Sequence, residues 1–278
     1  MHGLNNKEKA LSSLLFVLFL ALAALFLFPF AWMISSSLKA RNDIFLTPPV
    51  WIPDVLHWEN YTQLFAERHF GNVILNSLFT ATTGTAGALL FCSLAGFAFA
   101  KYQFRGKSLL FGLVLASLMV PMESSMIPLF MIYRKLGMID NLWGVILPRL
   151  TSAFGIFYMR QYCASIENEL LEAGRIDGCS EVRMYFRLIV PILLPAFASL
   201  GIIFFVEEWN NFLWPTVLLR SPEHLTIAVA IRALEAGVRT PYHLIMSGSV
   251  ISIMPMLAII FIFQKQLIMG LMDGSVKG

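Results

Sequence analysis

The chain has 278 residues, of which 58% are hydrophobic and only 13% are charged. Soluble domains contain about 45–50% apolar residues, so this composition is typical of a membrane protein. The net charge of +3 is too small to predict a nucleic-acid-binding protein. Three unclustered cysteines and five histidines without ligand-like spacing predict neither a disulfide framework nor a metal site.

The first half of the chain alternates apolar runs with polar segments. Residues 10–34 are apolar, and a run of about 25 residues is too long for the core of a signal peptide, so we expect an uncleaved membrane span. Residues 35–69 contain several prolines and two tryptophans and predict an irregular loop outside the membrane. A second span is expected at about 70–100.

Small residues recur at every fourth position of the second predicted span. They are Thr80, Gly84, Ala88, Cys92, Gly96 and Ala100. Such a stripe lets the backbone of another helix approach closely, which is how helices associate in lipid. A lipid-facing surface is the alternative, but six small residues in register favour a packing face.

Four further spans are expected in the rest of the chain, at about 108–132, 142–163, 192–219 and 244–269. The predicted fold is therefore an all-α integral membrane protein with six transmembrane helices, in one transmembrane domain covering residues 1–278. Six spans place both termini on the same side of the membrane. Basic residues divide almost evenly between the two sides, with Arg149 counted opposite the termini, so charge alone sets no orientation.

Residues 165–191 form a dense polar stretch between the fourth and fifth spans. Its charged residues are Glu167, Glu169, Glu172, Asp177, Glu181, Arg175, Arg183 and Arg187. The pattern predicts two short helices, with Ser165 and Ser180 as their N-caps and a break at Asp177-Gly178. On the second helix one apolar side is expected, formed by Val182, Tyr185, Phe186 and Ile189.

The spacing within this stretch resembles the EAA loop of the membrane subunits of bacterial ABC importers. Glu172-Ala173-Gly174 precedes Gly178, and Pro191 follows at the family's distance, although Gly174 replaces the second alanine. The resemblance extends to the sugar-importing, maltose-type permeases over most of the chain. It includes the segments AGRIDG at 173–178 and WNNFLWP at 209–215.

The resemblance implies a permease subunit in the bacterial inner membrane, with both termini and the EAA loop in the cytoplasm. Its implied partners are a second homologous permease subunit, a cytoplasmic ATPase dimer, an extracytoplasmic solute-binding protein and membrane lipid, and no nucleic acid. Gly106-Lys107-Ser108 resembles the end of a phosphate-binding loop, but Lys101 stands where its first glycine belongs. We therefore expect that this chain is not an enzyme and binds no cofactor, and that Mg-ATP binds to the partner ATPase.

The resemblance also implies which residues couple ATP hydrolysis to transport. They are Glu172, Ala173, Gly174, Asp177, Gly178 and Pro191. Glu172 would pair with a basic group of the ATPase, Gly178 would permit the turn between the helices, and Asp177 would help to fix it. For Glu172, a simple solvated charge is the alternative.

Polar residues within or near the spans are candidates for the substrate pathway. They are Glu123, Glu207, Glu208, Trp209, Asn210 and Asn211. Carboxylates in a span are costly unless they face a cavity or a partner. This set suits a sugar and argues against a strongly anionic solute. The alternative is that Trp209 and Trp214 anchor the chain at the membrane interface.

Other functions stay open at this point. Within the importer class, the solute could be a glycerol-phosphate or a related polyol. A self-sufficient secondary transporter would carry inverted repeats and midplane sites, and no repeat is visible. A membrane scaffold that only anchors a soluble partner would not need carboxylates inside its spans. No catalytic constellation is present in the sequence.

Overall fold

The computed structural model describes residues 6–236 and 239–273, and the side chains of residues 11–236 and 239–264. Every regular element in these residues is a helix, which confirms the predicted all-α class. The chain divides into two compact units, residues 1–68 with 231–253 and residues 69–230 with 254–278. The predicted positions of the two termini concern residues outside the described range.

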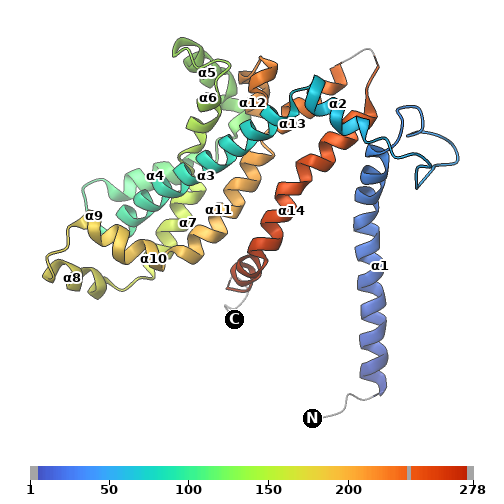
Figure 1. Ribbon diagram of the computed structural model, residues 1–278. Coiled ribbons are helices and arrows are strands. Elements are labelled where there is room, and N and C mark those ends of the chain that lie inside the picture. Colours follow the sequence, from blue (N-terminus) through green and yellow to red (C-terminus); the bar gives the residue numbers. More distant parts are fainter. Residues whose placement is uncertain (1–5, 237–238, 274–278) are drawn as a thin grey trace. The chain divides into compact units, whose positions relative to one another are not determined.

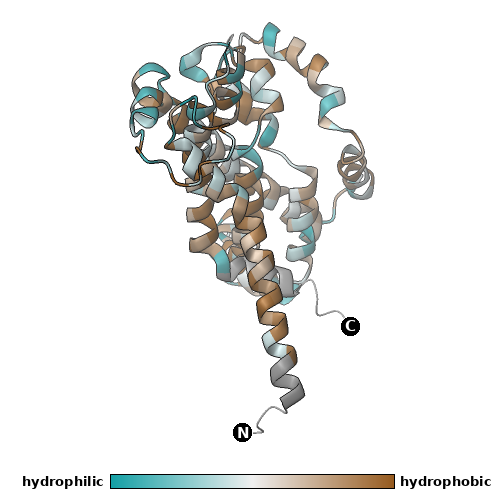
Figure 2. Ribbon diagram, turned by 90° about the vertical axis from the view of Figure 1, so that its right-hand side faces the viewer, coloured by the Kyte–Doolittle hydropathy of each residue, from teal (hydrophilic) through white to brown (hydrophobic). Residues whose placement is uncertain are grey.

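The first unit begins with α1 (Asn6–Ser37), in which residues 14–34 are apolar on all sides (Figure 2). Every side chain from Leu11 to Ala31 is exposed. A helix that is hydrophobic all round requires an apolar environment, and residues 11–37 are long enough to cross a membrane. This agrees with the membrane span expected at residues 10–34.

Polar bonds tie the end of α1 to other parts of the first unit. The side-chain amide of Asn60 donates to the carbonyl oxygens of Ser37 and Lys39, both at 2.9 Å. Ser247, on α14 (Tyr242–Asp273), donates to the same Ser37 oxygen at 3.0 Å. Asn60 lies on α2 (Glu59–Glu67), so the expectation of an irregular segment over 35–69 was wrong at its end. Burial of Asn60 and Leu64, one helical turn apart, stabilises this short helix.

The second unit is built around α3 (Phe70–Lys101), which packs along α7 (Ala153–Ala164) and α11 (Leu194–Trp209) (Figure 1). The stripe of small residues is buried from Thr80 to Gly96, which confirms that it is a packing face. A Cβ atom on Gly96 would lie 2.7 Å from both Met159 Cβ and the backbone nitrogen of Arg160. Only glycine therefore allows this approach of α3 to α7.

Three helix pairs of the second unit are bent at a short break. α4 (Lys107–Ser117) and α5 (Met122–Lys135) are bent by 102°. α6 (Leu142–Ile146) with η1 (Leu147–Arg149) is bent by 44° against α7, and residues 181–192 are bent by 78° against residues 194–218. Three described helices are long and apolar enough to cross a membrane, or up to six if each bent pair is one span. The span expected at 142–163 corresponds to one of these bent pairs. Ser152 starts a new helix there, because its hydroxyl accepts a hydrogen bond from the Gly155 backbone nitrogen at 3.2 Å.

Asp140 fixes the segment after α12 (Leu213–Leu218). Its Oδ1 accepts from the backbone nitrogens of Arg220 at 2.8 Å and Ser221 at 3.0 Å, and its Oδ2 accepts from the Ser221 hydroxyl. His224, in η3 (Pro222–His224), lies 3.2 Å from the same carboxylate. Burial alone would raise the pKa of Asp140, but these hydrogen bonds outweigh it and hold the pKa well below its usual value.

Residues 165–191 form the predicted pair of short helices with a turn between them. The first is α8 (Asn168–Ile176), and the second begins with α9 (Glu181–Met184). Gly178 lies in the turn at φ +73°, a conformation that favours glycine. Ser180 caps α9 by accepting from the Arg183 backbone nitrogen at 3.3 Å, as predicted.

Two details of this segment differ from the prediction. Ser165 does not cap α8, because it remains helical at the end of α7 and its hydroxyl donates to the Tyr162 carbonyl oxygen at 2.8 Å. The four apolar residues of the second helix do not share one side. Tyr185 and Ile189 are buried, whereas Val182 and Phe186 are 68% and 54% exposed. A π-helical turn, η2 (Tyr185–Ile189), changes the angular spacing of the side chains before α10 (Val190–Ile192) continues the chain.

The remaining described elements are α13 (Ile227–Ala233) and η4 (Leu234–Ala236).

Candidate functional site

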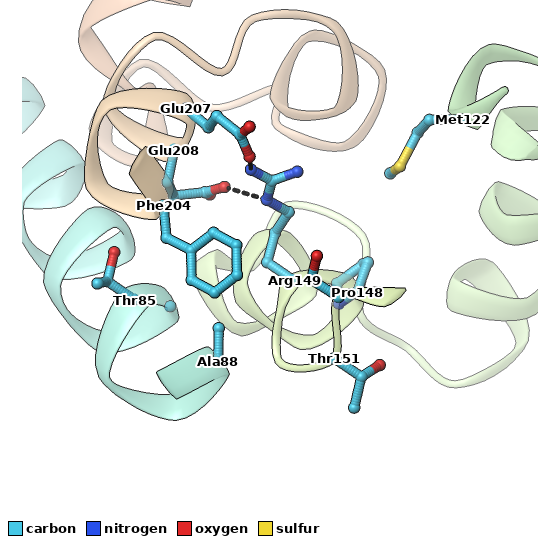
Figure 3. A pocket seen from close by; sticks show the side chains of 11 residues that line it. Thr85, Ala88, Met122, Pro148, Arg149, Thr151, Phe204, Glu207 and Glu208 are labelled. Atoms are coloured by element: carbon cyan, nitrogen blue, oxygen red, sulfur yellow. Dashed lines mark hydrogen bonds and ion pairs between the residues drawn. The ribbon is translucent and has the colours of Figure 1, made fainter. Parts of the chain in front are cut away.

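A cavity of about 150 Å³ lies within the second unit, between α3, α11, the junction of α6 with α7, and the start of α5 (Figure 3). Its walls include Gly84, Thr85, Arg149, Phe204, Glu207 and Glu208. Gly84 lies near the middle of α3, roughly 21 to 26 Å from the two ends of that helix at about 1.5 Å per residue. The cavity is therefore at the mid-depth of a helix that is long enough to cross a membrane.

Three helix interruptions meet at this cavity. Met122 is the first residue of α5 after the bend that follows α4, and Arg149 is the last residue of η1 before the bend into α7. Glu207 and Glu208 occupy the last turn of α11, directly before the non-helical residues 210–212. Non-helical backbone at membrane depth is tolerated where it is buried in protein or lines a water-filled cavity. Broken helices around a midplane cavity are typical of transport proteins.

One guanidinium group serves two carboxylates at this site. Arg149 Nη2 lies 2.7 Å from Glu207 Oε2, and Arg149 Nε lies 3.1 Å from Glu208 Oε2 (Figure 3). The side-chain amide of Asn211 donates to the same Glu208 oxygen at 3.2 Å. With both carboxylates ionised, the three charged groups carry one net negative charge.

Two polar atoms in the cavity wall are buried without a hydrogen-bond partner among the described residues. They are Glu208 Oε1 and Thr85 Oγ1. The Glu208 side chain is only 2% exposed, so bulk water does not solvate its carboxylate in this chain. Buried polar atoms are normally hydrogen-bonded. A buried polar atom without a partner in the folded chain therefore indicates a bound water, ion or ligand.

The structure brings together some of the predicted pathway residues and separates others. Glu207 and Glu208 line the cavity and Asn211 bonds to Glu208, whereas Asn210 is exposed and donates to the Val206 carbonyl oxygen at 2.8 Å. Glu123 is exposed and does not line the cavity, although its neighbour Met122 does.

The two tryptophans of the interface-anchoring alternative are both buried. Trp209 is 2% exposed and stacks on Phe205 with ring centroids 6.0 Å apart. Trp214 is 1% exposed, and its indole nitrogen donates to the Gly144 carbonyl oxygen at 2.9 Å. A side chain enclosed by its own chain does not reach lipid headgroups, so this geometry does not fit the alternative.

Arg149 was missed as a site residue by the sequence analysis, which counted it among the basic residues outside the membrane. A signal was nevertheless present. Two adjacent carboxylates in a span require a cation, and Arg149 is an arginine inside another predicted span. No sequence pattern relates the two positions, because they lie 58 residues apart.

The predicted coupling residues of the 165–191 segment lie mostly at its surface. Glu172, Ala173, Asp177 and Gly178 are exposed, and so is Pro191 beyond the π-helical turn. Gly174 is buried, and a Cβ there would lie 3.0 Å from Met184 Sδ. The glycine in place of the family's second alanine therefore lets α8 pack closely against α9.

The same segment is attached to the end of α3. Lys101 Nζ donates to Asn168 Oδ1 at 2.9 Å and to the Ile166 carbonyl oxygen. The hydroxyls of Ser93 and Tyr185 are hydrogen-bonded at 2.5 Å. Hydrogen bonds therefore connect the segment to the helix that forms one wall of the cavity.

Among the described side chains, no group of three or more metal-ligating residues is present. Long and broken helices around a mid-depth polar cavity, together with an exposed pair of short helices, define a membrane transport component. Residues 92–271 match the family described as the binding-protein-dependent transport system inner membrane component. The chain belongs to this family, the permease subunits of ABC importers.

Relatives of known function match almost the whole chain. The chain is 38% identical over 268 residues to the arabinooligosaccharides transport system permease protein AraQ of Bacillus subtilis (strain 168), covering 94% of each. It is 34% identical over 259 residues to the lactose transport system permease protein LacG of Rhizobium radiobacter, covering 93% and 94%. It is 28% identical over 260 residues to the sn-glycerol-3-phosphate transport system permease protein UgpE of Yersinia enterocolitica, covering 90% and 92%.

A solved structure supports the fold. A chain of a bacterial ABC transporter involved in the import of the acidic polysaccharide alginate aligns with a TM-score of 0.84, covering 95% of this chain and 99% of that one. At 22% sequence identity, this likeness concerns the fold alone.

Proposed function

We propose that this chain is one permease subunit of an ATP-driven importer for a sugar or an oligosaccharide. The observation that carries the proposal is the near full-length similarity to permeases named for arabinooligosaccharides and lactose, at 38% and 34% identity. A glycerol-phosphate solute is the second candidate, because permeases for sn-glycerol-3-phosphate are 28% identical.

The charge of the cavity favours the sugar over the phosphate. Glu207 and Glu208 outnumber Arg149, and all three side chains line the wall. A phosphate group would be repelled by the uncompensated carboxylate at short range, where low dielectric strengthens the interaction. A neutral polyol meets no such repulsion and can donate hydroxyl hydrogens to the carboxylates.

The proposed topology has six spans, with each bent helix pair crossing the membrane once. It places both termini and residues 165–191 in the cytoplasm of a bacterial cell, within one transmembrane domain over residues 1–278. The density of charge in residues 165–191 supports a position outside the lipid.

Coupling to a separate ATPase is proposed for Glu172, Ala173, Gly174, Asp177, Gly178 and Pro191. Support comes from the exposure of Glu172 beside Ile176, a large apolar side chain that is 86% exposed. An acid next to an exposed apolar residue suits a docking surface with a charged contact. The bonds from Lys101 and Ser93 to this segment provide a path from the ATPase to α3.

The proposed assembly contains a second homologous permease subunit, an ATPase dimer that binds Mg-ATP, and an extracytoplasmic solute-binding protein. A solved alginate transporter in complex with an alginate pentasaccharide-bound periplasmic protein aligns with a TM-score of 0.65, which supports the last partner. The proposed solute pathway includes Glu207, Glu208, Trp209, Asn210 and Asn211, with Glu123 at a separate exposed position.

Reconstitution tests this function directly. The chain is purified with the subunits that accompany it, placed in proteoliposomes and supplied with ATP, and uptake of arabinotriose, lactose and glycerol-3-phosphate is measured. We expect ATP-dependent uptake of a sugar by the assembly and none by the chain alone. Uptake by the chain without an ATPase would favour a secondary transporter, and uptake of glycerol-3-phosphate alone would favour the second candidate.

A further inference from the structure

We infer that this subunit itself contacts the transported sugar, through a subsite in which Glu208 Oε1 accepts a hydrogen bond from a sugar hydroxyl and Thr85 Oγ1 bonds the same or a neighbouring hydroxyl. Arg149 is the positioning residue of this subsite. The inference rests on the proposed function, since it names the chemistry by which the chain recognises its solute.

The two carboxylate oxygens of Glu208 differ in their hydrogen-bond partners. Oε2 receives Arg149 Nε at 3.1 Å and Asn211 Nδ2 at 3.2 Å, which fixes the carboxylate. Oε1 stays buried without a partner among the described residues. A carboxylate oxygen only accepts hydrogen bonds, so its missing partner must be an O–H or N–H donor.

Thr85 supplies a second unpartnered atom from another helix. Its Oγ1 is buried without a partner among the described residues, and its side chain lines the same cavity from α3 (Figure 3). A threonine hydroxyl both donates and accepts. Glu208 on α11 therefore offers a hydrogen-bond acceptor, and Thr85 on α3 offers a donor or an acceptor. This pair matches neighbouring hydroxyl groups on a sugar ring.

Other ligand classes fit less well. An anion would be repelled by the net negative charge of Arg149, Glu207 and Glu208. No metal-ligating group of three lies among the described side chains. Phe204 adds an apolar surface beside Glu208 on which the carbon–hydrogen face of a sugar ring could lie (Figure 3).

The cavity is large enough to hold a ligand. Its volume of about 150 Å³ is well above the ~10–15 Å³ that one water molecule needs. The rival explanation is that Arg149, Glu207 and Glu208 only lock α7 to α11 and that water fills the cavity.

Two variants of the assembled transporter separate these explanations. In Glu208→Gln, the amide oxygen should remain toward the donors Arg149 and Asn211, so an NH₂ group replaces the free acceptor. Loss of the charged acceptor should raise the half-saturating lactose or arabinotriose concentration about tenfold, with the maximal rate within about twofold of wild type. Thr85→Val, of similar size, should raise it about fivefold.

Matched controls lie on exposed positions outside the cavity. Glu223→Gln removes the same charge, and Thr82→Val makes the same change one turn away on the exposed side of α3. Both should leave uptake unchanged. Arg149→Lys keeps one positive charge but cannot hold both acids in the same fork geometry, so its half-saturating concentration should rise by a smaller factor than that of Glu208→Gln.

Monodeoxy analogues of lactose identify the hydroxyl. The wild-type assembly should bind the analogue that lacks the donating hydroxyl about tenfold more weakly than it binds lactose. The Glu208→Gln assembly should bind this analogue and lactose about equally well. If the wild-type assembly transports no sugar, the proposed function is wrong, and the subsite is wrong with it. If wild type transports sugar but Glu208→Gln and Thr85→Val keep its half-saturating concentration within twofold, the subsite alone is overturned. The subsite would also be overturned if the variants lowered the maximal rate or the yield of the assembly but left the half-saturating concentration unchanged. That result would support a purely structural role for the ion pairs.

Discussion

The cavity between α3, α7 and α11 and the two-helix segment at residues 165–191 both present carboxylates, but in opposite environments. Glu208 is 2% exposed and is held by Arg149 and Asn211. Glu172 is exposed, and its carboxylate has no ion pair or hydrogen bond within the described part of the chain. Two side chains of the chain itself bond to the first acid, whereas the second has no such partner among the described residues.

This difference indicates where each acid acts. A buried carboxylate without a counter-charge would destabilise the fold, so its partner must belong to the same chain. An exposed carboxylate contributes little to folding and remains available for docking. Removal of the cation that serves the two cavity acids should therefore affect stability first, whereas changes in the two-helix segment should affect coupling first.

The largest effect is expected from Arg149→Met. The variant leaves Glu208 buried beside Glu207 without its cation, and breaking a buried pair costs about 3–5 kcal/mol. Because the Arg149 side chain is 30% exposed, we expect the lower end of that range, about 3 kcal/mol. Denaturant titration of the purified chain in detergent measures the loss, with the exposed Arg105→Met as its control. Equal stability of the two variants would show that the cavity acids need no internal cation.

A smaller loss of stability is expected from Gly96→Ala. The new methyl group would lie 2.7 Å from Met159 Cβ and from the Arg160 backbone nitrogen, so α3 and α7 must separate. Overpacking of this kind costs about 1–3 kcal/mol. Gly112→Ala is the matched control, because nothing lies within 4 Å of its added Cβ. Thermal unfolding in detergent compares them, and a tolerated alanine at position 96 would count against close helix packing there.

The coupling side of the comparison is tested by Glu172→Ala. A docking carboxylate that meets a basic partner makes a charge-assisted bond, and its removal should weaken ATPase docking about tenfold at ~1.4 kcal/mol. The stability of the chain should not change. Solute-stimulated ATP hydrolysis and co-purification of the ATPase are the measurements, with Glu167→Ala as a control on the same segment. If Glu172→Ala changed the solute preference and left ATPase coupling intact, the coupling role proposed for Glu172 would be wrong.

The smallest effect concerns Asp140, a partly exposed carboxylate between these extremes. Its pKa is lowered in the folded chain, so its stabilising contribution is present above the unfolded value and is lost as pH falls through the folded value. Asp140→Asn should cost about 1 kcal/mol at neutral pH. Asparagine tolerates the φ of +58° at this position, so the change isolates the charge. The difference from wild type should shrink below pH ~4, near the unfolded pKa of aspartate. A difference that is constant with pH would point to packing instead.

Local features of the fold were accessible from the sequence. The four-residue spacing of small side chains from Thr80 to Gly96 predicted a packing face because that spacing places them on one side of a helix. Gly178 marked the turn between α8 and α9 because glycine accepts positive φ without strain. Both predictions depend only on neighbouring residues.

Features that depend on tertiary contact were not accessible. The π-helical turn at Tyr185–Ile189 lies among apolar residues of which Tyr185 and Ile189 are buried and Phe186 is exposed, and no local sequence pattern predicts it. The pairing of Arg149 with Glu207 and Glu208 joins positions 58 residues apart and emerges only when α11 packs beside the α6–α7 junction.

The chain order of that ion pair constrains biogenesis. Arg149 leaves the ribosome before Glu207 and Glu208, and a charged residue at the centre of an isolated span costs ~2.5–3.5 kcal/mol to insert. The earlier span would therefore enter lipid with an unmatched cation unless the insertion machinery retains it until the later span arrives. If the ion pair forms during insertion, the two segments complete their membrane integration together.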